Sequence, residues 1–521
     1  MFPLKAFALF QLFIIAALMA TRTSPAATIY VSGPGTNAPL QHAVDRAHDG
    51  DVIVVAPGVY ELTNAITITK AIVLECTNQP PGQVLLNQSN LGAPCLGISN
   101  TFAVVDGLSL QFPPSLRASP SPSAVVMTGG MVQNCLFSNS DYSGSVAMTG
   151  GVLSNCIVNY QPSHGPLSNP AVYCESGLVT DCQIYGSGVY SIYNSGGGII
   201  LVNAELRNSL VSGSPGSADS PVYAVSSSIV GCRIVHNRTL GFGGGAILNS
   251  SFMDQCLVAF NTSSAEGEGG GGIFETNSLI RNSLIISNVA TYGQPEPGMG
   301  GYGGGVRMRG GSLVNCTISG NTAYSCPSNY NAFGLGAGLY VESGGITNCI
   351  LFANYFTGCD NSENDWSNAG AGVFDHCCTT PDPGGAGNVI QDPQFVSLTN
   401  GDFHLASTSP CIGAGVVQPW MANATDPDGN PRTSNGGVDI GAYETPATNS
   451  PPPSLRIVAT ATNTLIIAWP ASATGYALEQ NSNLNSSGWF GVNATPNAVN
   501  GEKQAAALPD QAGMFYRLRR N

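Results

Sequence analysis

The chain has 521 residues, of which 9% are charged and 65 are glycine, and its formal net charge is −14. An acidic chain of this kind is repelled by nucleic acid and anionic lipid, and mildly by a polyanion such as pectate unless cations bridge them. Few charges and many Gly, Ser and Asn residues suit a solenoid whose turns are polar but uncharged.

The first residues have the pattern of an export signal. Lys5 precedes an apolar run over residues 6–20, and Ser24-Pro25-Ala26 offers a cleavage site, so residues 1–26 are predicted to be a signal peptide. A membrane anchor is the alternative, but the run is shorter than the roughly 20 residues that span a bilayer. The predicted location is secreted, extracellular or at the cell surface, without a lipoprotein anchor because no Cys follows the run.

The next segment predicts a cap for a stack of coils. Residues 28–31 have the composition of a strand, residues 39–48 that of a short helix, and residues 51–60 open the first coils. An amphipathic helix in this position would cover the open end of a solenoid, whose exposed strand edges would otherwise promote aggregation.

A short phrase recurs through the middle of the chain. It consists of an apolar residue, two positions, Cys or Ser, one position and a second apolar residue, and its copies are 21 to 33 residues apart. A fixed phrase at that spacing predicts a solenoid in which each copy is one coil. The nine centres are Cys135, Cys156, Cys182, Ser209, Cys232, Cys256, Ser283, Cys316 and Cys349.

The spacings within the phrase predict short strands joined by bends. Two positions from Cys to the next apolar residue is a strand period, and three positions on the other side require a bend. A further strand, announced by glycines as in Gly243-Gly244-Gly245-Ala246-Ile247, precedes each later phrase. Several short strands per coil predict a parallel β-helix, and the period is too irregular for a leucine-rich repeat. An Asn column at positions 237, 261, 288, 321 and 354 could bond from coil to coil.

The cysteines of the phrase are predicted to face the core. Adjacent coils lie close enough for a disulfide, so spacing alone does not decide their redox state. Ser209 and Ser283 in the same column favour small, reduced side chains. Cys326 and Cys359, each ten residues after a column Cys, are the best disulfide candidates. No metal is predicted, because no Cys/His quartet has zinc-ligand spacing, and the segment 376–378 is interpreted as a packed loop.

The chain changes character near residue 446. Residues 445–454 contain four prolines and form a predicted linker. Residues 455–521 show alternating strands at 464–469, 476–479, 489–492 and 515–518, which predict a small β-sandwich similar to a fibronectin type III domain.

The segment beginning TIYVSGPGTNAPLQHAVDRAHDGDVIVVAPGVYEL resembles the N-terminal cap and first coils of right-handed β-helix proteins of the pectin-lyase-like superfamily. The strings FDHCCTTPDPGGAGNVIQDPQF, GDFHLASTSPCIGAG and DPDGNPRTSNGGVDIGAYE resemble the choice-of-anchor Q domain. The strings GGGAI and AFNTSS are similar to repeats of polymorphic outer-membrane proteins, and residues 455–521 resemble modules of exported verrucomicrobial proteins. The resemblance implies an exported bacterial protein but no reaction.

The predicted organisation is therefore all-β. It comprises a right-handed parallel β-helix with its cap, a choice-of-anchor Q closing region, a linker and a small β-sandwich. Their bounds are residues 1–26 for the signal peptide, 27–373, 374–444, 445–454 and 455–521.

The best candidates for catalytic groups lie in the column two positions before the Cys column. Asp254 and Arg281 would lie on adjacent coils, with Arg207 two coils from Asp254. The pair is either an acid–base site or a surface ion pair, and the column from residue 133 onward contains no cluster of carboxylates. Glu266 and Glu268, in a Gly-rich loop, are interpreted as solvated.

The segment Asp426-Pro427-Asp428-Gly429-Asn430 has two interpretations. Its oxygen-bearing side chains could bind calcium, or it could form a tight turn in which an Asp pairs with Arg432. No residue is assigned a catalytic or metal-binding role, and no cofactor is predicted.

The leading hypothesis is a monomeric, non-catalytic surface or extracellular protein that contacts polysaccharide or cell-envelope glycans. The alternatives are a polysaccharide lyase or glycoside hydrolase of the same fold, and a structural spacer.

Overall fold

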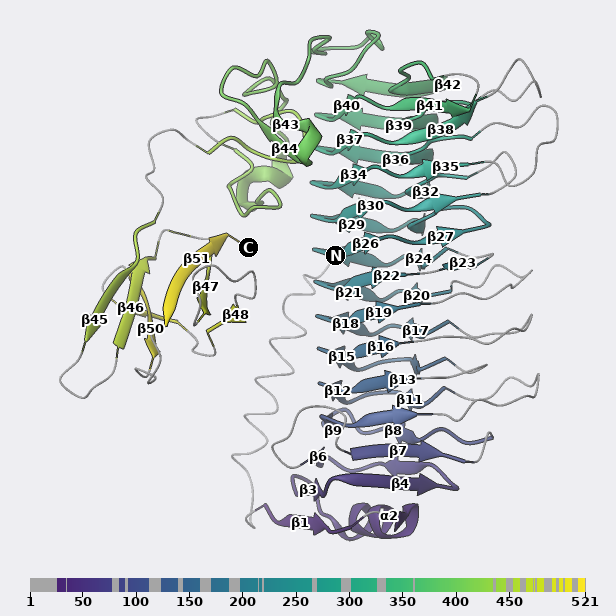
Figure 1. Ribbon diagram of the computed structural model, residues 1–521, viewed down its shortest axis with the longest axis vertical. Coiled ribbons are helices and arrows are strands. Elements are labelled where there is room, and N and C mark those ends of the chain that lie inside the picture. Colours follow the sequence, from purple (N-terminus) through teal and green to yellow (C-terminus); the bar gives the residue numbers. More distant parts are fainter. Residues whose placement is uncertain are drawn as a thin grey trace. The chain divides into compact units, whose positions relative to one another are not determined.

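The structure is a computed structural model and consists almost entirely of short β-strands stacked into a solenoid (Figure 1). In the part of the chain that it describes, no helix is long and apolar enough to cross a membrane. The described residues are 26–33, 35–76, 84–89, 92–111, 123–138, 144–159, 170–186, 197–213, 215–217, 220–264, 269–291, 301–325, 334–358, 361–433, 437–446, 453–459, 465–471, 473, 476–481, 490–492, 496–499, 502–507 and 514–520.

Sheet A, the largest, contains two parallel strand columns. From β5 onward, each coil contributes first a strand in column A1, which glycines precede in the later coils, and then a strand in column A2 that leads to the Cys position. Column A1 contains β5 (Ile66–Ile68), β8 (Leu96–Ile98), β11 (Val125–Met127), β14 (Val146–Met148), β17 (Val172–Glu175), β20 (Ile199–Val202), β24 (Val222–Val225), β28 (Ala246–Asn249) and β32 (Ile273–Thr276). Column A2 contains β1 (Thr28–Val31), β3 (Val52–Val55), β6 (Val73–Cys76), β9 (Val104–Asp106), β12 (Met131–Gln133), β15 (Val152–Ser154), β18 (Leu178–Thr180), β21 (Glu205–Arg207), β25 (Ser228–Val230), β29 (Phe252–Asp254) and β33 (Leu279–Arg281).

In the last coils the two columns merge into longer strands. These are β36 (Val306–Val314), β39 (Leu339–Thr347) and β42 (Trp366–Asp375).

Two further parallel sheets complete the wall of the solenoid. Sheet B contains β2 (Gly35–Thr36), β4 (Gly58–Leu62), β7 (Val84–Gln88), β10 (Ser109–Gln111), β13 (Leu136–Ser138), β16 (Ile157–Asn159), β19 (Gln183–Tyr185), β22 (Leu210–Ser212), β26 (Arg233–Val235), β30 (Leu257–Ala259), β34 (Leu284–Ile286), β37 (Thr317–Ser319) and β40 (Ile350–Phe352). Sheet C contains β23 (Pro215–Ser217), β27 (Arg238–Thr239), β31 (Thr262–Ser263), β35 (Val289–Ala290), β38 (Thr322–Ser325) and β41 (Tyr355–Gly358). The chain is thus a right-handed parallel β-helix, and the predicted fold class is confirmed.

Left-handed residues make the corners of the coils. At the corner between A2 and sheet B, directly before the Cys column, Asn155 has φ 49° and Asn208 has φ 44°. Asn tolerates this conformation better than most residues because its side chain bonds locally. The bend that the three-residue spacing predicts therefore lies at this Asn position.

The core is a set of inward-facing columns. The apolar residues on both sides of the Cys column are buried, as in Val158 and Ile184. The thiol of Cys156 donates to the carbonyl of Ser154 at 3.2 Å, and its sulfur accepts the backbone N–H of Cys135 at 3.4 Å. Burial raises the pKa of Cys156 well above its ordinary value, so this thiol is uncharged at neutral pH. None of the thirteen cysteines among the described residues is joined in a disulfide.

Serines fill the Cys column and a second column without disturbing this pattern. The hydroxyl of Ser209 accepts the N–H of Cys182 at 3.0 Å, as a thiol does elsewhere. At the corner between A1 and A2, Ser251 accepts the N–H of Ser227 at 3.2 Å and donates its own N–H to Ser278 at 3.1 Å. Small side chains with an acceptor atom are thus selected at both corners.

The predicted Asn column forms a buried ladder. The amide nitrogen of Asn261 donates to Oδ1 of Asn288 at 3.0 Å, and Asn288 donates in the same way to Asn321 at 3.0 Å. Asp365 ends the ladder by accepting the side-chain amide of Asn354 at 2.8 Å. The turns between sheets B and C are therefore satisfied internally.

A helix covers the first coil. Helix α2 spans Asn37–Arg46, where the sequence predicts a helix ending at residue 48. Leu40 and Val44, on the helix itself, are buried, so this face of the helix packs against the first strands. Nζ of Lys70 donates to the carbonyls of Asp45 at 2.6 Å and Ala47 at 2.7 Å and so holds the end of the helix.

A second compact unit contains Val314–Thr317, Ile346–Ile350 and Phe374–Asn521. It includes β43 (Phe395–Ser397), β44 (Asp402–Leu405) and the 3₁₀ turns η2 (Leu398–Asn400) and η3 (Pro419–Asn423). The amide of Asn348 donates to the carbonyl of Val416 at 2.9 Å, so the closing residues bond directly to coil residues of this unit.

The C-terminal strands form two small antiparallel sheets. One contains β45 (Arg456–Ala459), β46 (Leu465–Pro470), β50 (Glu502–Ala507) and β49 (Asn497–Val499), and the other contains β48 (Phe490–Gly491), β47 (Tyr476–Asn481) and β51 (Phe515–Arg520). Ile467, Trp469, Leu478 and Ala505 form a shared core. The fibronectin type III likeness stays a prediction.

Candidate functional site

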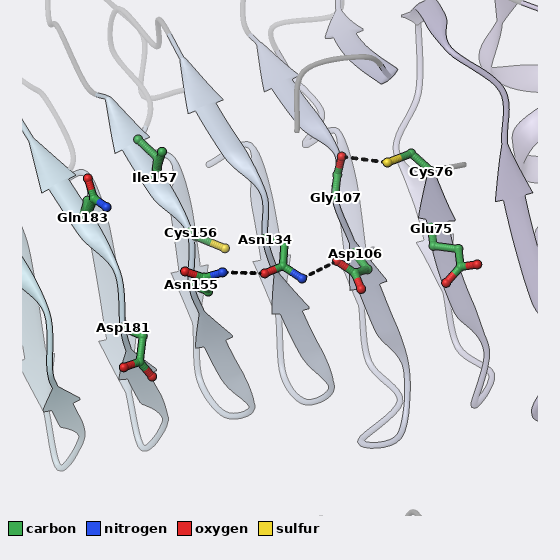
Figure 2. Close-up of a pocket in the computed structure, with 10 residues that line it drawn as sticks. All are labelled: Glu75, Cys76, Asp106, Gly107, Asn134, Asn155, Cys156, Ile157, Asp181 and Gln183. Atoms are coloured by element: carbon green, nitrogen blue, oxygen red, sulfur yellow. Dashed lines mark hydrogen bonds between the residues drawn. The ribbon is translucent and has the colours of Figure 1, made fainter. Parts of the chain in front are cut away.

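An acidic groove lies at the corner between A2 and sheet B in the early coils (Figure 2). Its cavity volume is about 460 Å³. Its polar lining comprises three carboxylates and three amides, from Glu75, Asp106, Asp181, Asn134, Asn155 and Gln183. These side chains gather because the same corner of successive coils is stacked in register.

Hydrogen bonds order the centre of this groove. Asp106 accepts the amide of Gln133 at 2.8 Å and the amide of Asn134 at 2.6 Å. Asn155 in turn donates to Oδ1 of Asn134 at 2.7 Å (Figure 2). Glu75 is the register partner of Asp106 on the preceding strand. Two carboxylates on adjacent coils are therefore presented beside a chain of amide groups.

Sequence reasoning missed these carboxylates. Glu75 and Asp106 belong to the column two positions before Cys, because β6 pairs with β9 and Asp106 pairs with Gln133. The coil of Asp106 has Leu108 in the place of the Cys, so an alignment based on Cys starts one coil after Asp106 and two coils after Glu75. This column therefore does contain neighbouring carboxylates, but they lie before residue 133.

Among the described residues, no three His, Cys, Asp or Glu side chains are grouped so that they could hold a metal ion.

The expected pair of Asp254 and Arg281 lies on adjacent coils, as predicted. Nη2 of Arg281 is 2.8 Å from Oδ2 of Asp254, and Asn282 donates its amide to Oδ1 at 2.9 Å. The Arg281 guanidinium also lies 4.7 Å from the ring centre of Phe252. Arg207 instead pairs with Glu205 at 2.5 Å. The Asp254 carboxylate is thus engaged as a structural ion pair.

The segment 426–430 forms a buried turn. Asp426 is fully buried and accepts the backbone N–H of Asn430 at 2.7 Å and of Glu444 at 2.9 Å. The sequence suggested that an Asp of this turn pairs with Arg432, but the ion-pair partner of Arg432 is Glu444, at 2.9 Å. Burial raises the pKa of Glu444 to about 8, and the Arg432 guanidinium opposes that rise. The carboxylate of Asp426 thus accepts hydrogen bonds from backbone N–H groups, and these bonds account for the turn without calcium.

A second group in this region was not foreseen. His404 bonds through Nδ1 to Asp402 at 2.6 Å and through Nε2 to Asp428 at 2.7 Å, and its ring stacks 4.0 Å from that of Tyr443. The bond to Asp428 is the main cause that raises the pKa of His404 to about 9, so the ring is a cation at neutral pH. His404 therefore connects β44 to the turn at residues 426–430.

Three other predicted features have different outcomes. Cys326 and Cys359, and likewise Glu266 and Glu268, lie outside the described residues. The segment 376–378 is indeed packed, and it also continues the Cys column: the thiol of Cys377 donates to the carbonyl of Ile346 at 3.3 Å.

A stripe of apolar and aromatic side chains runs along the outer face of column A1. Two residues of each column A1 strand from β17 to β32 project outward, and the first of them is half-buried and in register with its counterpart on the next coil. We call these first residues the outer stripe: Tyr173, Ile200, Tyr223, Ile247 and Phe274. Inward-facing residues of the same strands, such as Leu201 and Leu248, are fully buried.

The outer stripe ends in a cluster of arginines and aromatic rings. Phe274 is the register partner of Arg307, and the rings of Tyr302 and Tyr340 lie 5.3 Å apart beside that guanidinium. Phe242 stacks on Phe274 with 5.5 Å between ring centres. The stripe thus changes from purely apolar to cationic at this point.

No family model and no curated protein matches this chain. The resemblance of residues 374–444 to the choice-of-anchor Q domain therefore stays a prediction.

Solved structures with a similar arrangement include several polysaccharide-active proteins. Pectate lyase Pel9A has a TM-score of 0.33 and 15% identity over 81% of this chain and 97% of that one. The PL6 family alginate lyase AlyGC has a TM-score of 0.44 and 13% identity over 80% of this chain and 59% of that one. The tailspike protein gp49 of Acinetobacter baumannii bacteriophage Fri1, a capsular polysaccharide depolymerase, has a TM-score of 0.31 and 8% identity over 96% and 80% of the two chains. At these TM-scores, the fold assignment rests on the strand pairing of the chain itself.

Proposed function

We propose that this protein is an exported or surface-bound β-helix that contacts an extended glycan along column A1, without cleaving it. The observation that carries the proposal is the outer stripe. Tyr173, Tyr223 and Phe274 recur on every second coil and present rings at the surface, with aliphatic side chains between them.

Rings in this arrangement suit the faces of sugars. An aromatic side chain offers an apolar body, and a tyrosine adds a polar tip for a hydroxyl group. Coils repeat roughly every 4.8 Å, so successive rings form a ladder along the solenoid axis. A ligand that meets several of them must be extended and must lie across the strands.

The proposal is tested by binding of soluble glycans to wild-type protein and to Tyr223→Ala and Phe274→Ala. Both variants are expected to weaken binding of any glycan that the wild type retains in affinity electrophoresis. Tyr355→Ala is the matched control, because Tyr355 is an exposed ring on sheet C, away from column A1. Equal retention of all four proteins would contradict the role of the stripe. A wild type that retains no glycan would leave a structural spacer as the better description.

A second candidate function is a polysaccharide lyase or glycoside hydrolase, and the acidic groove favours its hydrolase form. Glu75 and Asp106 lie on adjacent coils, roughly 4.8 Å apart along the stack. Retaining hydrolases place two carboxyl groups roughly 5 Å apart on either side of the scissile bond. Release of reducing ends by the wild type, and its loss in Glu75→Gln and in Asp106→Asn, would favour this function over the non-catalytic one.

A further inference from the structure

Two arginines at the end of the outer stripe share one carboxylate. Oε1 of Glu342 accepts Nε of Arg307 at 3.1 Å, Nη2 of Arg307 at 2.8 Å and Nε of Arg309 at 2.9 Å. Two guanidinium groups against one carboxylate leave a formal local charge of +1 on a chain whose net charge is −14.

The surrounding rings hold both guanidinium groups in place. That of Arg307 lies 5.5 Å from the ring centres of Phe274 and Tyr302 and 5.8 Å from that of Tyr340. That of Arg309 lies 5.1 Å from the ring of Phe274. Cation–π contacts at these distances orient a guanidinium without neutralising its charge.

Arg309 is the member of the pair that a ligand could reach. Its side chain is 37% exposed, whereas that of Arg307 is 5% exposed. It is fixed through Nε, and among the described residues no hydrogen bond or ion pair joins its two terminal Nη groups to another residue. An arginine held at Nε presents its Nη edge, which can bind a carboxylate or a sulfate.

The nearest acidic group on the interior side does not cancel this charge at neutral pH. Glu275 is buried on the inward face of β32, and its Oε2 accepts the backbone N–H of Ser278 at 3.0 Å. Burial raises the pKa of Glu275 to about 8, so the carboxyl is mostly protonated below that pH.

We propose that Arg309, supported by Arg307 and Glu342, binds an anionic group, a carboxylate or a sulfate, on a sugar of the glycan that stacks on the outer stripe. The inference rests on the proposed glycan contact and adds the ligand class. The net charge of −14 narrows the ligand class further, because an acidic protein repels a densely charged anionic polymer. The ligand is therefore a largely neutral glycan with acidic groups at intervals.

The test compares acidic polymers with their neutralised forms. Hyaluronan, xanthan, chondroitin sulfate and a neutral galactomannan are titrated against the wild type, together with carboxyl-reduced and desulfated forms of the acidic polymers. We expect the best acidic ligand to lose about ten- to hundredfold in affinity in Arg309→Gln, which is the size of effect of a charged hydrogen-bonded contact. Arg309→Lys keeps the charge and should lose less. Carboxyl reduction or desulfation of that ligand identifies which anionic group is bound and should reproduce the loss.

Arg233→Gln is the matched control, because Arg233 is an exposed arginine on sheet B. It removes the same formal charge and should leave affinity unchanged. Unchanged affinity in Arg309→Gln, or equal binding of acidic and neutralised polymers, would overturn the inference. If Tyr223→Ala still weakened binding in that case, the proposed glycan contact would stand without the acidic group. If neither Arg309→Gln nor Tyr223→Ala weakened binding, both the inference and the proposed glycan contact would fail.

Discussion

Asn288 is fully buried, and its amide connects successive coils. Its nitrogen donates to the carbonyl of Val258 at 2.9 Å and to Asn321 at 3.0 Å, and its oxygen accepts the N–H of Asn261 at 3.0 Å. We predict that Asn288→Ala lowers the free energy of unfolding by about 1–3 kcal/mol, because it leaves buried polar groups unpaired. Urea denaturation measures this change.

The control is Asn249→Ala, at an outward, half-buried position of β28. It should change the free energy of unfolding by less than about 0.5 kcal/mol. Asn321→Ala should behave like Asn288→Ala. Losses below about 0.5 kcal/mol in both ladder variants would contradict the ladder's contribution to stability.

Glu275 makes stability depend on pH. Burial raises its pKa from 4.5 in an unfolded chain to about 8 in the folded one. Between these two values the folded chain keeps a proton that the unfolded chain has released, so the free energy of unfolding falls as pH rises. The stabilisation of the protonated form is complete below about pH 4.5 and is lost by about pH 8.

We predict that Glu275→Gln removes this slope. The amide retains an acceptor for Ser278 but does not titrate, so the variant should match the wild type near pH 4.5 and exceed it at pH 8. The pKa shift of Glu275 on folding corresponds to several kcal/mol in the free energy of unfolding, on the order of 1.4 kcal/mol per pKa unit. Urea denaturation across this pH range measures it, and parallel curves for the two proteins would show that Glu275 is not the cause.

The Cys column acts as an element, since each thiol bonds within its own coil and to the next. Cys256 donates to the carbonyl of Asp254 at 3.2 Å, and its sulfur accepts the N–H of Cys232 at 3.4 Å. Its own N–H donates to the hydroxyl of Ser283 at 3.1 Å, so Ser performs the same role. In these bonds the S–H group donates to a backbone carbonyl. A disulfide sulfur carries no hydrogen, so disulfides would leave these carbonyls without donors.

We therefore predict that labelling of the unfolded, non-reduced protein finds the column thiols free. The residues concerned are Cys135, Cys156, Cys182, Cys232, Cys256, Cys316 and Cys349. Mass spectrometry of the labelled peptides shows how many of these cysteines carry the label. A result in which most of them are joined to one another would refute the thiol ladder.

The same element shows what the sequence could and could not predict. The apolar and Asn columns follow from spacing alone, because core positions repeat at fixed distances from Cys. The outer stripe follows a similarly fixed spacing, since Tyr173 and Tyr223 each lie nine positions before Cys182 and Cys232. The catalytic candidates in the sequence lie in a different column, so the outer stripe was not predicted. By contrast, the carboxylates of the groove could not be predicted, because the first coils lack the Cys on which the alignment depends. The partner of Arg432 could not be predicted either, because that region has no sequence repeat.

At the scale of the whole molecule, charge argues against a uronate lyase. Such an enzyme must stabilise a developing enolate, which requires concentrated positive charge or a bound metal. The described residues that line the acidic groove include Glu75, Asp106 and Asp181 but no Lys or Arg. The guanidinium of Arg281 is already paired with Asp254.

We predict that the protein forms no unsaturated product from pectate, alginate or other uronates, with or without calcium. The measurement is the absorbance of the unsaturated sugar over a prolonged incubation. The acidic lining would raise the energy of an anionic transition state, and the cationic cluster around Arg309 lies on another strand column, where Glu342 is already paired with both guanidinium groups. Absorbance that appears with the wild type and vanishes in both Asp254→Ala and Arg281→Ala would make the chain a lyase, with that ion pair as its acid–base site.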